Sequence, residues 1–178
     1  TLERLHAAGF ILPDPPVAGG NYLPFRVVGC LVYLPGAISS WNGDVKFHGK
    51  VGDGLTIEQG YEAARLCALN LLANLQSAIG DLDRVRQVIS VNGYVNCVPG
   101  FPSSPKVING ASDLLVLVFG DAGRNGEHVR IENDVFGWES GLLGQQLIGS
   151  RADFELALAG VGLAAFVKGH DYYGGAIP

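Results

Sequence analysis

Polar residues that could line a binding site are set in otherwise apolar segments: Asn21, Tyr22, Asn109, Arg124 and Arg130. Asn109 precedes Gly110 inside a segment with a helical pattern, where glycine is unfavourable. Two interpretations of this pair are open. Asn109 could be a surface residue beside a tolerated glycine. Alternatively, its side chain could face a cleft, with Gly110 allowing another backbone to approach closely.

The chain lacks the short motifs that mark many catalytic sites. It has no nucleophile elbow, phosphate-binding loop, metal-ligand motif or dinucleotide fingerprint. Its four histidines are not spaced for shared ligation on one helix. Asp81 and Asp83 flank a loop beside Arg84, which favours local capping or pairing over acid–base chemistry.

Composition and charge narrow the class of protein. The chain has 178 residues, of which 48% are hydrophobic and 16% charged, as expected for a single folded domain. A net charge of −5 disfavours nucleic acid as the main partner, because phosphate binding usually requires a basic surface. The three cysteines have no metal-ligand spacing, so buried reduced thiols are expected. No apolar run suits a membrane span and no signal-peptide pattern is present, so we expect a cytoplasmic or mitochondrial-matrix location.

The elements that would position these residues begin with strands. Phe25–Val28 and Leu31–Leu34 predict a hairpin around Gly29 and Cys30. The Asn42-Gly43 pair favours a type I′ turn, with Val45–Phe47 returning as a strand.

Two helices and a further strand follow. Thr56 and Gln59 form a capping box for a helix that reaches about Ile79 and ends at Gly80. Alternation over residues 86–95 predicts a strand. Pro105 starts a second helix, which runs from about Lys106 to Phe119. This order predicts an α+β fold with one sheet and two helices on one face. The other sheet face would be covered in an oligomer, for which a trimer is one solution.

Several recognisable segments follow one another along the chain: Gly20–Phe25, Val32–Ile38, Leu55–Arg65, Gly80–Val85, Pro105–Leu115 and Val118–Gly120. In this order they are similar to motifs of the RidA/YjgF family, also known as endoribonuclease L-PSP. The resemblance covers residues 2–130. It implies a chorismate-mutase-like α+β fold, with a single mixed sheet and two helices on one face, in a homotrimer with clefts between subunits. Characterised relatives hydrolyse enamine or imine intermediates such as 2-aminoacrylate to 2-oxo acids and ammonia. They need no metal or organic cofactor.

The resemblance also implies roles for individual residues. Tyr22 matches the cleft tyrosine, Gly36 the strand end and Asn109 the helix asparagine. The family's carboxylate-binding arginine follows a His-x-Arg pattern, which ends here at Arg130 after a short insertion; Arg124 is the alternative. A guanidinium group suits this role because it can bind a carboxylate through two parallel hydrogen bonds.

The chain also departs from the family pattern. Pro35 and Ala37 replace the usual serine and glutamine. Residues 126–178 are atypical, and 154–167 fit either a strand pair or a glycine-interrupted helix. Glu155 is the weak candidate there for the carboxylate that positions the attacking water. Either the last strands follow an insertion or the C-terminal part is altered.

Three functions therefore remain open. The first is an imine deaminase, a hydrolase acting on a small carboxylate substrate. The second is a non-catalytic, regulatory trimer that binds small carboxylates, which the Pro35 and Ala37 changes favour. The third is an endoribonuclease or translation inhibitor, the older family label, which the acidic net charge disfavours.

Overall fold

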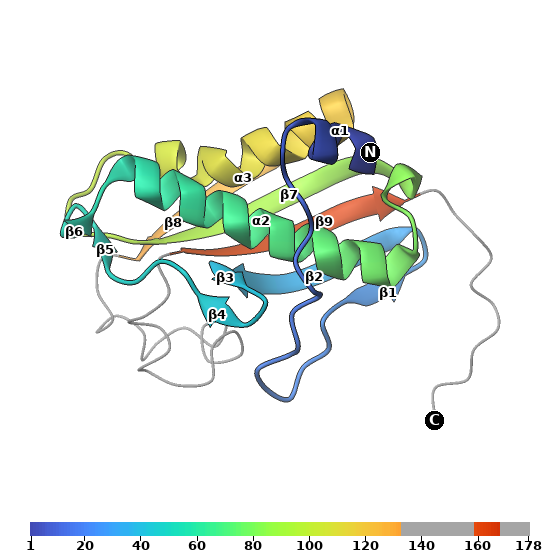
Figure 1. Ribbon diagram of the computed structural model, residues 1–178, viewed down its shortest axis with the longest axis horizontal. Coiled ribbons are helices and arrows are strands. Elements are labelled where there is room, and N and C mark those ends of the chain that lie inside the picture. The colour runs from blue at the N-terminus through green and yellow to red at the C-terminus, as the bar shows by residue number, and fades with distance from the viewer. Residues whose placement is uncertain (133–158, 168–178) are drawn as a thin grey trace.

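The main sheet is built from strands that are far apart in the sequence. The computed structural model describes residues 1–132 and 159–167. The strand order is β1-β2-β9-β7-β8; within this sheet β7 and β8 are parallel and the other neighbouring strands are antiparallel (Figure 1). The five strands are β1 (Arg26–Val28), β2 (Leu31–Ile38), β7 (Val85–Asn96), β8 (Gly126–Glu132) and β9 (Ala159–Val167). A parallel pair needs a crossover connection, which the helix between β7 and β8 provides.

Two long helices, α2 (Ile57–Ile79) and α3 (Ser104–Phe119), pack on the same face of this sheet (Figure 1). α2 lies against β2 and β9, and α3 against β7 and β8. Alternate residues of the strands, such as Val32, Val91 and Leu163, are buried beneath the helices. The predicted α+β fold with a helix-covered sheet is therefore confirmed.

Short elements complete the described chain. They are α1 (Leu2–Ala7), β3 (Ser40–Trp41), β4 (Asp44–Val45), β5 (Lys50–Val51), β6 (Gly54–Leu55) and the 3-10 turns η1 (Leu82–Arg84) and η2 (Gly120–Gly123). β3 pairs with β4 and β5 with β6, giving two small ladders that the prediction of one sheet did not include. Within residues 1–132 and 159–167, no helix is long and apolar enough to cross a membrane.

Local sequence signals account for the boundaries of α2. The Thr56 amide donates to Gln59 Oε1 at 2.9 Å, and the Gln59 amide donates to Thr56 Oγ1 at 3.2 Å. The predicted capping box is therefore present. Gly80 ends the helix with a φ of 78°, a left-handed conformation that glycine adopts without a steric penalty.

Removing this cap should weaken the fold by a modest amount. Thr56→Ala leaves the amide of Gln59 without its acceptor, so we expect a loss of about 1 kcal/mol of unfolding free energy. Chemical denaturation followed by circular dichroism measures the change. Ser77→Ala, at an exposed position on the same helix, is the control and should change stability little. Equal stability of both variants and the native chain would show that the cap does not stabilise the helix.

The sheet face opposite the helices carries exposed apolar side chains. Val28 is 63%, Tyr33 48% and Ile89 44% exposed. Exposed apolar surface of this kind often marks a contact with another protein. The expected covering of this face by further subunits stays a prediction.

The C-terminal part of the described chain is simpler than its sequence suggested. β9 spans Ala159–Val167 and lies between β2 and β7, so this segment is one central strand. Residues 133–158, on which the choice between an insertion and an altered C-terminal part depends, lie outside the described residues.

Candidate functional site

A bulge in β2 marks one wall of the candidate site. Leu34 pairs with Leu163 and Ala37 pairs with Val161, so Pro35 and Gly36 together lie opposite a single residue of β9. Such a bulge interrupts the ladder of backbone hydrogen bonds. Backbone groups of this segment can therefore form hydrogen bonds with a ligand, although Pro35 itself has no N–H to donate.

The extended segment that precedes β1 forms a second wall. The Tyr22 hydroxyl oxygen accepts a hydrogen bond from the Gly19 amide at 3.2 Å. The Asp14 amide donates to the Asn42 side-chain oxygen at 2.9 Å, which ties this segment to the turn between β3 and β4. Asn42 and Gly43 have φ values of 48° and 92°, as the predicted type I′ turn requires.

These walls enclose a pocket of about 460 Å³ in which two of the predicted site residues meet. Tyr22 lines it from the extended segment and Gly36 from the bulge. Most of the remaining lining is proline and small apolar residues, with polar groups from Ser40, Asn42 and Asn74. The volume is within the range that holds small organic ligands.

Helix α2 supports this pocket with two buried asparagines one turn apart. Asn70 Nδ2 donates to the carbonyl of Ser40 at 2.7 Å and to that of Ile38 at 3.2 Å, which fixes the end of β2 against the helix. Asn74 lines the pocket directly. Sequence reasoning missed both residues, although two asparagines at i and i+4 on the apolar face of a helix were a usable signal.

Three other predicted residues, Asn109, Arg124 and Arg130, are not among the residues that line this pocket. Asn109 is exposed on α3. Arg124 is exposed after η2 and pairs with Asp121 at 3.2 Å. Arg130 lies on β8, in register with Tyr94 of β7. Glu155 falls outside the described residues.

The sheet order keeps Arg130 and Gly36 apart within one chain. β8 is three strand spacings from β2, which is roughly 14 Å at about 4.8 Å per strand. One chain therefore brings Tyr22 and Gly36 together but does not add Arg130 to them.

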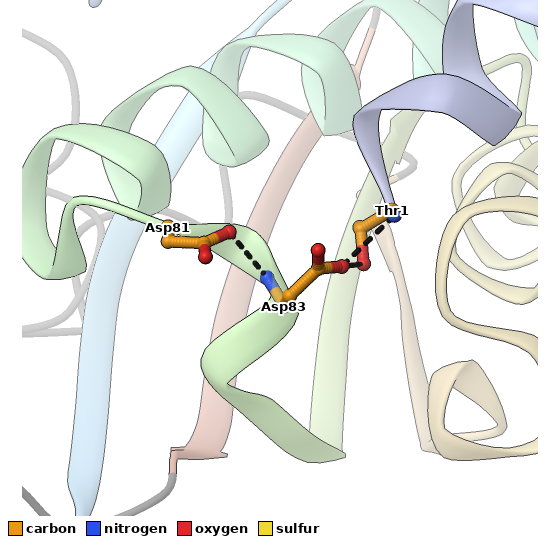
Figure 2. Close-up of polar contacts among 3 residues, drawn as sticks. All are labelled: Thr1, Asp81 and Asp83. Carbon is orange, nitrogen blue, oxygen red and sulfur yellow. Dashed lines mark hydrogen bonds and ion pairs between the residues drawn. The ribbon is translucent and has the colours of Figure 1, made fainter.

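The pair of Asp81 and Asp83 has a structural role, as predicted (Figure 2). Asp81 Oδ1 accepts from the Asp83 amide at 2.9 Å and caps η1. The Asp83 carboxylate accepts a hydrogen bond from the Thr1 hydroxyl, which lowers the pKa of Asp83. A carboxyl group that is held ionised in this way is not suited to act as a general acid.

Two titratable side chains of α2, one buried and one partly exposed, have raised pKa values. Cys67 is buried in α2, and burial raises the pKa of its thiol. The Tyr61 hydroxyl donates to Asp113 at 3.0 Å, and the pKa of Tyr61 is raised by desolvation and then by this bond. Among residues 1–132 and 159–167, no group of three histidine, cysteine or acidic side chains could hold a metal ion.

Comparisons with known proteins show the family to which the chain belongs. A family model described as YjgF/chorismate_mutase-like, putative endoribonuclease, matches residues 2–144. Protein TCP17 of Trypanosoma cruzi is 37% identical over 129 residues, which are 72% of this chain and 78% of that protein.

Solved structures show the same fold. A putative endoribonuclease from Shewanella oneidensis MR-1 is 31% identical with a TM-score of 0.79, over 93% of this chain and 98% of that one. The protein Atu1372 of unknown function from Agrobacterium tumefaciens is also 31% identical, with a TM-score of 0.74 over 93% and 90% of the two chains. RidA from an Antarctic Psychrobacter species, at 14% identity and a TM-score of 0.53 over 86% and 94% of the chains, is similar in fold alone.

Proposed function

Because this chain belongs to the YjgF/chorismate-mutase-like family, we propose that it hydrolyses enamine or imine intermediates of the 2-aminoacrylate type to 2-oxo acids and ammonia. The observation that carries the proposal is the pocket itself. Tyr22 and Gly36, which match the family's cleft positions, come from different segments and line one cavity.

The proposed site is completed by a second copy of the chain in a homotrimer. Arg130 lies on the edge strand β8, which is separated by β7 and β9 from β2 and its pocket-lining bulge in the same chain. A neighbouring subunit could bring its β8 edge to the pocket, and the exposed apolar face with Tyr33 and Ile89 would be buried by such an assembly. The expected solution mass is three times 18.7 kDa.

The proposed chemistry needs binding and water placement but no cofactor. Arg130 binds the substrate carboxylate, and Asn109 adds a polar contact from α3. The enamine takes a proton on carbon to become the imine, and water then adds to the imine carbon. The C–N bond breaks, ammonia leaves with the transferred protons and the carbonyl of the 2-oxo acid forms. Glu155 and backbone groups at the Gly36 bulge are the candidates that position the water.

A second function, binding of small carboxylates without turnover, is favoured by one observation. Pro35 lines the pocket and Ala37 is only 8% exposed, so the side chains at these two positions provide no polar group near the expected reaction centre. The description of the family model also mentions endoribonuclease activity. We favour this activity less, because a protein with a net charge of −5 repels a polyanion such as RNA.

Release of a 2-oxo acid tests the proposal. In the assay, a serine dehydratase generates 2-aminoacrylate. Semicarbazide is added as a competing reagent that traps the intermediate as a semicarbazone. We expect the native chain to accelerate formation of pyruvate and ammonia above the spontaneous rate and to reduce semicarbazone formation. Unchanged rates, together with binding of 2-oxo acids in calorimetry, would instead support the non-catalytic function.

A further inference from the structure

Asn74 is 6% exposed, lines the pocket and makes no side-chain hydrogen bond within residues 1–132 and 159–167. Its amide atoms are not among the fully buried unpartnered polar atoms of these residues, so they remain accessible at the pocket wall. Asn70, one helical turn earlier, has a different role, because its amide nitrogen donates to the carbonyls of Ile38 and Ser40. An accessible amide on a largely buried side chain is free to donate to, or accept from, a polar group that enters the pocket. The amide at the pocket wall therefore points to a ligand group.

The rest of the pocket limits what that group can be. Pro16, Val17 and Ile38 provide apolar walls, and Asp14 is the single charged residue among the described lining residues. An asparagine amide can donate to and accept from the same neutral polar group. The volume of about 460 Å³ also exceeds what a three-carbon acid such as 2-aminoacrylate fills.

We infer that Asn74 determines specificity by hydrogen bonding to an uncharged polar group at the end of the substrate's side chain. The substrate class is then a 2-imino acid, with its 2-oxo acid product, whose side chain is longer than that of 2-aminoacrylate and ends in an amide, carbonyl or hydroxyl group. This inference rests on the proposed function for the position of the carboxylate. The side chain would extend past Tyr22 towards α2.

A pair of nearly isosteric product acids provides the test. The 2-oxo acids derived from asparagine and leucine are similar in shape, but the first ends in an amide group and the second in an isopropyl group. Calorimetry on the full chain should show that the asparagine-derived acid binds about tenfold more tightly, as one satisfied hydrogen bond allows. Asn74→Leu should lose or reverse this preference while the protein stays folded, with thermal stability unchanged or raised.

The outcomes separate this inference from the proposed function. Equal binding of both acids by the native chain, binding of neither, or an unchanged preference in Asn74→Leu would each overturn it, whatever the deaminase assay shows. Selective binding without turnover would support it and count against the deaminase. If Asn74→Leu does not fold, Asn74→Ala, which adds no bulk, should lose the preference in the same titration. A marked loss of stability in both variants without a change in selectivity would assign Asn74 a structural role and overturn the inference.

Discussion

Arg130→Ala is expected to lower kcat/KM for imine hydrolysis by about 100-fold or more, because loss of a bidentate bond to the substrate carboxylate costs about 3 kcal/mol. Arg130 lies on β8, which pairs with β7 in parallel. Arg130→Lys keeps the charge but loses the planar pair of donors, so it should retain intermediate activity. The measurement is 2-oxo acid formation from enzymatically generated 2-aminoacrylate.

Arg124→Ala is the matched control, since Arg124 is the alternative carboxylate binder in the same part of the sequence. Its guanidinium is exposed and pairs with Asp121 at 3.2 Å, so its removal should change kcat/KM little. Circular dichroism and sedimentation must show that both variants stay folded and keep the native assembly. If Arg124→Ala lost activity and Arg130→Ala kept it, the two roles would have to be exchanged.

Gly110→Ala is expected to destabilise the fold by about 3 kcal/mol and to lower Tm by about 10 °C. Gly110 lies where α3 crosses α2. A Cβ at this position would overlap the carbonyl oxygen of Tyr61 and lie 3.2 Å from the amide nitrogen of Arg65. Both atoms belong to the backbone of a regular helix, so the two helices would have to move apart.

Gly60→Ala is the control for Gly110→Ala, because Gly60 also lies on a helix and also faces the contact between α2 and α3. A Cβ there would meet only side-chain carbons, at 3.1 Å from Val107 and Val51. The gain in helix propensity of about 1 kcal/mol is similar for the two substitutions, so the difference between them isolates the backbone contact. Thermal and urea unfolding give the comparison. Similar midpoints for the two variants would contradict the close approach of the helices.

The close packing at Gly110 answers one question that the sequence left open. Glycine follows Asn109 because another backbone approaches closely, and the neighbouring backbone is that of Tyr61. Asn109 itself is exposed in the single chain, so its role in a cleft depends on the proposed trimer.

Elements whose signals are local could be predicted from the amino-acid sequence. The capping box at Thr56, the Asn42-Gly43 turn and the stop at Gly80 each act through neighbouring residues, so they could be read without the fold. The β1–β2 hairpin, both long helices and the family membership also followed from contiguous motifs.

The contacts between residues distant in sequence became apparent from the three-dimensional fold. β9 contains Gly160 and Gly162, which remove the alternation that identifies a strand, and its central place depends on pairing with both β2 and β7. The bulge at Gly36 likewise depends on that pairing. The pocket joins the Tyr22 segment, this bulge and α2, so the spacing of Asn70 and Asn74 on one helix face could not by itself place Asn74 at a pocket wall. The sheet order places Gly36 and Arg130 three strand spacings apart in one chain, because strand pairing is set by non-local contacts.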